Sequence, residues 1–212
     1  IYGCLVGSEM CIRDRSYLLI PMDSEGIEVR PLVDMTMKAG FNEVFFTDVK
    51  IPETNIVGKR GEGWAVANAT LGHERGSLAP PDAIMNRVNM LIDLMKEEKL
   101  DGKPLIEHPI YRDRLMKIQG KVMASQSHAL RLLSAKLNPG QDVKVGKMIQ
   151  KLVGTELRHE LEGLAIDVMG EIGVLYEDSP HLRDKGSWQF IYMYFLGSVS
   201  YTHLTLPTMA IV

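Results

Sequence analysis

A glutamate and an arginine stand side by side at Glu74 and Arg75, at the end of the run Leu71-Gly72-His73-Glu74-Arg75. A carboxylate held within hydrogen-bond reach of a substrate is a common general acid or base. The alternative is an ordinary solvated charge, and neighbouring helix positions point apart, so these two residues cannot pair on one helix face. If the protein has chemistry, we expect it to involve Glu74.

The elements expected to position Glu74 are a strand, a turn and a helix. Residues 41–46 (FNEVFF) combine aromatic and β-branched side chains with polar ones, which favours a strand. Pro52 ends the extended segment, because proline cannot donate a backbone hydrogen bond to a sheet. Residues 58–63 (GKRGEG) predict a turn, and Trp64 opens a helix that leads to Glu74.

Two further strands are expected before this one, at residues 17–20 and 27–32, and the second alternates apolar and polar side chains. From Trp64 onward, the apolar spacing becomes helical. After Pro80 and Pro81, one apolar stripe consists of Ile84, Val88, Leu91, Leu94 and Met95.

Further helices are predicted from Pro109, from about residue 142 to 170, and over 188–196. The stripe of the helix from Pro109 contains Leu115, Ile118, Val122 and Met123. Helices of this length indicate packing in a bundle. The expected fold is therefore an α+β fragment, mainly α: a partial antiparallel β-domain over 16–59, then an up-down helical bundle over 60–198.

The two ends look foreign to the rest. Residues 10–14 (MCIRD) can be encoded by ATGTGTATAAGAGAC, and the reverse complement of that DNA encodes residues 199–203 (VSYTH). Such an inverted repeat resembles translated sequencing-library adapter DNA, as in a metagenomic fragment. We therefore expect residues 1–15 and 199–212 to be artefact and exclude them from fold reasoning.

Composition and charge narrow the classes of function. The chain has 24 basic and 27 acidic residues, a net charge of −3, which gives little support to nucleic-acid binding. Both cysteines lie before residue 16, which excludes a disulfide or a cysteine metal site in the remainder. No second ligand stands at metal spacing from His73 or His108, and no stretch approaches a membrane span. We expect a cytoplasmic protein without a metal.

A family becomes visible when four motifs are taken together. These are residues 41–52 (FNEVFFTDVKIP), 55–58 (NIVG), 61–64 (GEGW) and 102–109 (GKPLIEHP). Their order and spacing resemble the acyl-CoA dehydrogenase family, at the passage from the middle β-domain into the C-terminal helical domain. The resemblance covers essentially all of 16–198 and implies that the N-terminal helical domain, most of the β-domain and the last helices are missing.

The resemblance implies a reaction and its participants. A carboxylate removes the α-proton of an acyl-CoA thioester while the β-hydride passes to FAD, and an electron-transferring flavoprotein accepts the electrons. It also implies a homodimer or homotetramer. Some members place the base in a Leu-x-x-Glu-Arg context, which Leu71–Arg75 matches, so Glu74 is the candidate base and Arg75 a candidate substrate contact. Residues 167–173 (DVMGEIG) occupy the place of the flavin segment, which makes Asp167, Gly170 and Glu171 candidate cofactor contacts.

Four acids depart from the family pattern. Glu98 and Asp101 stand where many members have an arginine and a phenylalanine that reach the flavin of a partner subunit. Asp167 replaces a glutamine and Glu171 a glycine. Negative charges near flavin phosphates are unfavourable unless the local geometry differs.

Several alternatives remain open. Many family members carry the base in a later segment, which would begin just beyond Ser198. The chain could also derive from a non-catalytic relative that serves as a scaffold, or from a related flavin oxidase acting on a non-thioester substrate. The fragment alone is expected to be inactive.

Overall fold

The computed structural model describes residues 15–77, 80–138, 143–176 and 179–197. The two terminal segments attributed to adapter DNA lie outside these ranges, apart from Arg15. The chain divides into two compact units, one running to Glu74 and the other starting at Arg75.

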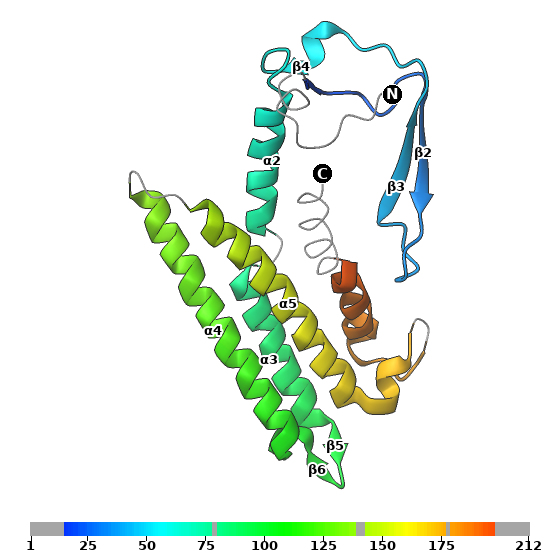
Figure 1. The fold of residues 1–212 in the computed structure, drawn as a ribbon. Coiled ribbons are helices and arrows are strands. Elements are labelled where there is room, and N and C mark those ends of the chain that lie inside the picture. The colour runs from blue at the N-terminus through cyan, green and yellow to red at the C-terminus, as the bar shows by residue number, and fades with distance from the viewer. Residues whose placement is uncertain (1–14, 78–79, 139–142, 177–178, 198–212) are drawn as a thin grey trace, which may run out of the picture. The chain divides into compact units, whose positions relative to one another are not determined.

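The first unit contains two short antiparallel pairings (Figure 1). Strand β2 (Ile27–Leu32) pairs with β3 (Phe41–Phe46), with Ile27 opposite Phe46 and Leu32 opposite Phe41. Strand β1 (Tyr17–Leu18) pairs with β4 (Ile56–Val57), which follows the 3-10 helix η1 (Glu53–Asn55). The predicted strands are present, although β1 is shorter than expected.

The β2–β3 hairpin exposes apolar side chains on both faces, including Phe41, Phe46 and Leu32. An isolated two-stranded hairpin is marginally stable because it cannot bury a core by itself. These exposed residues agree with the expectation of a partial β-domain.

Helix α2 (Gly63–Ser77) begins one residue before Trp64, and its start is hydrogen-bonded to the residues just before strand β1. The N–H of Gly63 donates to the carbonyl of Arg15 at 2.7 Å, and the N–H of Gly61 donates to Ser16 Oγ at 3.1 Å. A Cβ at position 63 would lie 2.5 Å from the backbone carbon of Ser16, so only glycine permits this approach.

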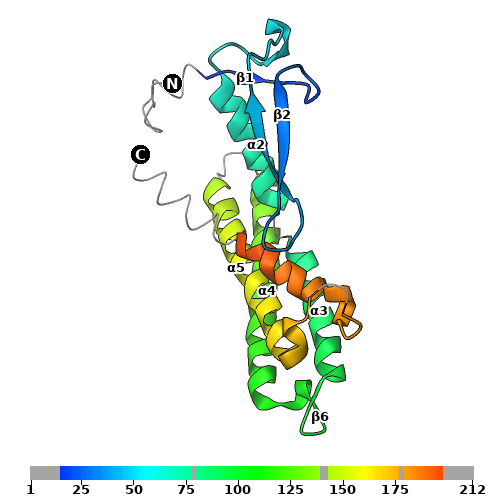
Figure 2. The same ribbon diagram turned by 90° about the vertical axis from the view of Figure 1, so that its right-hand side faces the viewer.

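The second unit is a helical bundle in which three long helices lie side by side (Figures 1 and 2). They are α3 (Pro81–Glu97), α4 (Pro109–Leu137) and α5 (Lys144–Met169). Pro81 and Pro109 each occupy the first turn of their helix, where the missing N–H costs nothing.

Shorter elements connect these helices and close one end of the bundle. Strands β5 (Lys99–Leu100) and β6 (Lys103–Pro104) form a hairpin, followed by the 3-10 helix η2 (Leu105–Glu107). After α5 come the 3-10 helices η3 (Gly170–Val174) and η4 (Arg183–Gly186), and a helix over 187–197.

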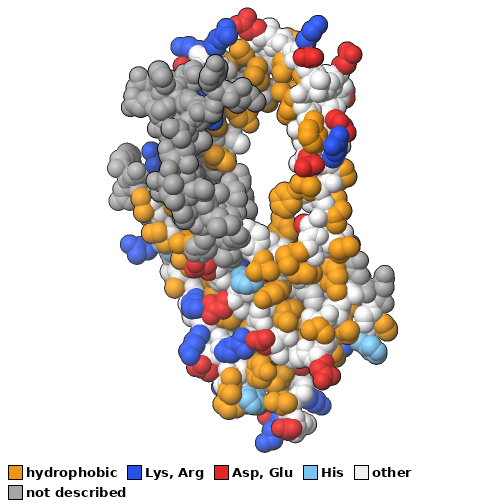
Figure 3. Space-filling view, turned by 45° about the vertical axis from the view of Figure 1, so that its right-hand side comes forward, with side chains coloured by type: hydrophobic (Ala, Val, Ile, Leu, Met, Phe, Trp, Pro, Cys, Tyr) orange, Lys and Arg blue, Asp and Glu red, His pale blue; other side chains and the backbone are white. Residues whose placement is uncertain are grey.

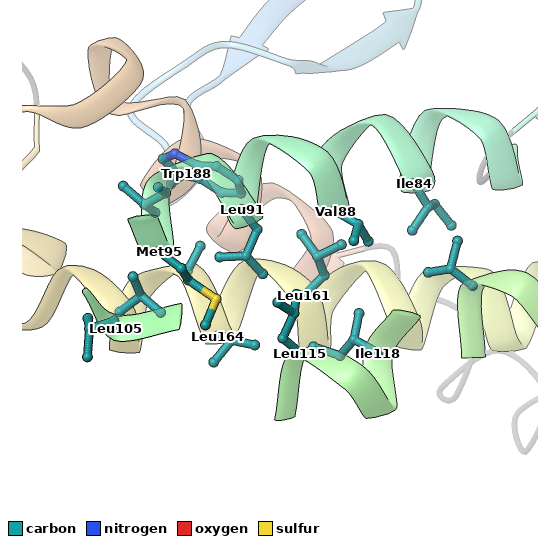
Figure 4. Packing of buried hydrophobic residues seen from close by; sticks show 14 of the residues in the cluster. Ile84, Val88, Leu91, Met95, Leu105, Leu115, Ile118, Leu161, Leu164 and Trp188 are labelled. Atoms are coloured by element: carbon teal, nitrogen blue, oxygen red, sulfur yellow. The ribbon is translucent and has the colours of Figure 1, made fainter. Parts of the chain in front are cut away.

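The core of this unit lies between the long helices (Figure 4). All five residues of the stripe predicted for α3 are buried. They meet a second apolar set from the other elements: Leu105, Leu115, Ile118, Val122, Leu157, Leu161, Leu164, Ala165, Val168, Met169 and Trp188. Apolar side chains also reach the surface of this unit (Figure 3), and Met123, predicted within the stripe of α4, is 57% exposed. The mainly helical α+β fold expected from the sequence is confirmed.

Candidate functional site

Glu74 and Arg75 lie in the last turn of α2, at positions 12 and 13 of its 15 residues. Their side chains lie outside the part of the chain that the structure describes. The glycine-rich turn precedes the helix that carries them. In this turn, Glu62 Oε2 accepts a hydrogen bond from the N–H of Lys59 at 3.1 Å. The carbonyl of Glu62 then accepts the N–H groups of Ala65 and Val66. The local structure thus supplies the strand, turn and helix that the sequence predicts before Glu74.

Asp167 lies at the end of α5 and is bound by an arginine from α4. Arg114 Nη2 donates to Asp167 Oδ2 at 2.7 Å, and both side chains are about half exposed. The charge of Asp167 is therefore already balanced within the chain.

Gly170 and Gly173 surround Glu171 and have different roles. Gly170 caps α5 with a φ of +55°, and no heavy atom lies within 4 Å of a Cβ built there. Its N–H already donates to the carbonyl of Asp167. A Cβ at Gly173 would lie 2.6 Å from the carbonyl oxygen of Ile166, so Gly173 permits close packing of η3 on α5. Glu171 itself is exposed.

Glu98 follows α3 and is held by Arg183 from η4. Arg183 Nε donates to Glu98 Oε1 at 2.5 Å, and this hydrogen bond with the negative charge of Glu98 raises the pKa of Arg183. Asp101 occupies the turn of the β5–β6 hairpin with a φ of +51°. An aspartate tolerates this left-handed conformation better than a phenylalanine would.

The structure also contains a buried ionic cluster that sequence reasoning missed. Glu162 on α5 is fully buried and accepts Arg87 Nε at 3.0 Å, Arg87 Nη2 at 2.9 Å and Arg158 Nε at 2.9 Å. The guanidinium of Arg87 stacks on Trp188 at 3.5 Å and also donates to Ser187 Oγ. A signal was available, because Arg87 stands at core spacing from Ile84 and Leu91.

A flavin pyrophosphate is dianionic and needs cations or free N–H donors. At the end of α5, Asp167 already forms an ion pair with Arg114, and the N–H of Gly170 already donates to the carbonyl of Asp167. The third residue, Glu171, is an exposed acid. Each uncompensated acid opposes a phosphate charge at 4 Å by about 1 kcal/mol in water and about 4 kcal/mol at an effective dielectric constant near 20. These residues do not fit a phosphate-binding site.

Metal sites and membrane spans are two further classes of feature. No group of three or more potential ligands among the described residues could hold a metal ion. In the same residues, no helix combines the length and apolar character needed to cross a membrane.

Comparison with known proteins identifies the family. The family model for the acyl-CoA dehydrogenase C-terminal domain matches residues 61–191. Acyl-CoA dehydrogenase IpdE1 of Mycobacterium tuberculosis is 34% identical over 183 residues, which cover 84% of this chain and 44% of that protein.

Two solved structures share the fold. The ChsE4-ChsE5 complex from Mycobacterium tuberculosis gives a TM-score of 0.76 at 22% identity, over 96% of this chain and 54% of that one. The FAD complex of PigA gives 0.75 at 16% identity, over 92% of this chain and 50% of that one. The chain thus spans about half the length of these proteins. The resemblance found in the sequence motifs is confirmed: the chain belongs to the acyl-CoA dehydrogenase family.

Proposed function

We propose that the whole protein dehydrogenates an acyl-CoA thioester between its α and β carbons. The observation that carries the proposal is the Leu71–Arg75 motif, which lies in the second half of helix α2, the helix that follows the glycine-rich turn, in a chain of this family. The family's flavin chemistry makes FAD the expected hydride acceptor, and we assign none of the described residues to hold it.

Glu74 is proposed as the base that takes the α-proton. Such a base must be ionised, desolvated and within hydrogen-bond reach of the α-carbon, and its proton transfer contributes typically 10²–10⁴-fold to the rate. Arg75 is proposed as a contact to the substrate, because a guanidinium can donate to the carbonyl oxygen of the thioester or to the phosphate oxygens of coenzyme A.

The assembly is also a proposal. The solved ChsE4-ChsE5 structure is a complex of two differently named chains, which supports association of this protein with further chains of its fold. We retain a homodimer or homotetramer as the proposed state, with an acyl-CoA substrate and an electron-transferring flavoprotein as acceptor. Mass measurement of the full-length protein in solution tests the assembly.

The catalytic proposal is tested by replacing Glu74 with glutamine in the full-length protein. We expect acyl-CoA-dependent flavin reduction to fall by roughly 10²-fold or more with flavin content unchanged, because glutamine cannot accept the proton. Glu160→Gln is the matched control, since Glu160 lies on the exposed side of α5 and pairs with Lys121 in solvent. Undiminished reduction in Glu74→Gln would place the base elsewhere and refute its assignment.

The two alternative functions, a flavin oxidase acting on a non-thioester substrate and a non-catalytic scaffold, are not favoured by the fold. An acyl-CoA-independent consumption of oxygen would reveal the oxidase, and a full-length protein that binds neither FAD nor acyl-CoA would reveal the scaffold.

A further inference from the structure

Four acidic side chains gather at one end of the helical unit. Glu98 and Asp101 belong to the end of α3 and the β5–β6 hairpin, and Asp167 and Glu171 to the junction of α5 with η3 (Figure 1). By resemblance to the family, Glu98 and Asp101 stand where other members reach the flavin of a partner subunit, and Asp167 and Glu171 belong to the flavin segment. An inference drawn from them therefore rests on the proposed function.

Two of the four carboxylates are engaged by arginines of the same chain. Arg183 binds Glu98 at 2.5 Å and so joins η4 to the end of α3. Arg114 binds Asp167 at 2.7 Å and joins α4 to the end of α5. Each ion pair connects two elements that are distant in sequence, so both hold elements together at this end of the bundle.

The remaining charges at the junction of α5 with η3 are unfavourable for binding phosphate. Asp101 and Glu171 are exposed, and neither forms an ion pair with any other described residue. Arg114 and Arg183 offset two of the four acids, and the exposed Lys99 and Lys103 stand on the same hairpin as Asp101, so the uncompensated acid at the end of α5 is Glu171. The open space beside Gly170 does not compensate, because its N–H is already bonded to Asp167.

We infer that the ion pairs Arg114–Asp167 and Arg183–Glu98 form an internal clasp, which holds this end of the unit together. We infer further that this end does not hold the phosphates of a neighbouring chain's flavin. Arg114 and Arg183 pair with Asp167 and Glu98. Asp167 and Glu98 stand at positions from which other family members would contact the cofactor, and here both are engaged within the chain. Any flavin bound by an assembly of this protein then receives its phosphate contacts from other residues.

The test compares FAD binding by four full-length proteins: the wild type, Arg114→Gln, Asp167→Gln and Lys121→Gln. Lys121 is the matched control, because it pairs with Glu160 at 2.7 Å and also joins α4 to α5 on the exposed side. Dissociation constants are measured by flavin fluorescence at low and moderate salt. We expect all three variants to stay within about twofold of the wild type, since a surface ion pair remote from the ligand contributes little.

Hydrogen exchange supplies the readout of the clasp itself. We expect Arg114→Gln and Asp167→Gln to raise exchange at residues 167–173, and Lys121→Gln to leave that segment unchanged. If Arg114→Gln alone weakens FAD binding by roughly tenfold or more, Arg114 donates to a phosphate and the inference is overturned. Equal exchange at residues 167–173 in all four proteins also overturns it, since no clasp would then exist.

A titration with inorganic pyrophosphate separates this inference from the proposed function. A full-length protein that takes up no FAD refutes the function, but the pyrophosphate titration can still be read. Binding of pyrophosphate that is lost in Arg114→Gln and kept in Lys121→Gln overturns the inference. Absence of a difference between these two variants supports it.

Discussion

Glu162→Gln should lower the local stability of the helical unit more than the same substitution at an exposed glutamate. Glu162 is fully buried and accepts hydrogen bonds from Arg87 and Arg158, and Asp184 is a second, more exposed carboxylate 3.4 Å from Arg87. Glutamine has nearly the same shape but no charge, and its amide N–H₂ group would face these donors. Removing one partner of a buried ion pair costs about 3–5 kcal/mol, and here Arg87 would lose its main partner and keep only the longer contact to the partly exposed Asp184.

The same change at Glu160 is a control within one helix. Glu160 pairs with Lys121 in solvent, with side-chain exposures of 44% and 55%. An exposed pair of this kind contributes about 0–1 kcal/mol. Glu160→Gln therefore separates the effect of burial from the effect of losing a carboxylate on α5.

Hydrogen exchange of the full-length protein, followed by mass spectrometry on peptides from α3 and α5, gives the local free energy of opening. We expect Glu162→Gln to lower it by about 3–5 kcal/mol and Glu160→Gln by less than about 1 kcal/mol. Equal effects of the two substitutions would refute the reasoning, since the buried cluster would then contribute no more than a surface pair.

Two further predictions concern the first unit. Gly63→Ala places a Cβ 2.5 Å from the backbone of Ser16, so we expect a loss of about 1–3 kcal/mol, measured as faster hydrogen exchange in β1 and the first turn of α2. Exchange in α4 should not change, and a variant as stable as the wild type would contradict the close approach. Hydrogen bonds from the side chain and backbone N–H of Thr36 hold the pKa of Asp34 below the ordinary value of an aspartate. Because the folded-state pKa is the lower one, the stability from ionised Asp34 is complete above the unfolded pKa and is lost as pH falls through the folded pKa. NMR titration should show this lowered pKa, and the lowering should become smaller in Thr36→Val, which removes the hydroxyl donor but keeps the backbone N–H.

The sequence predicted the helices and their buried faces well where local rules decide. Pro81 and Pro109 mark helix starts because their ring geometry suits the first turn, and the stripe from Ile84 to Met95 is buried as its spacing requires. Met123 was expected in a core stripe, but the described residues leave it mostly exposed. Periodicity shows that a face is apolar, and it does not show which neighbour covers that face.

The candidate site was predictable only in part. Leu71–Arg75 could be found because the motif is contiguous and its helix follows from the preceding turn. The partners of Glu98 and Asp167 could not, because Arg183 lies 85 residues and Arg114 lies 53 residues away in sequence. Pairings over such distances depend on how whole helices pack, and no local pattern encodes them.

The central claim is that Glu74 removes the α-proton of an acyl-CoA. Exchange of that proton with deuterated water tests it most directly, because exchange reports proton abstraction without hydride transfer. Full-length wild-type protein should catalyse α-proton exchange of a saturated acyl-CoA or a non-oxidisable analogue, and Glu74→Gln should reduce its rate by roughly 10²-fold or more. Exchange at the wild-type rate in Glu74→Gln would contradict the account.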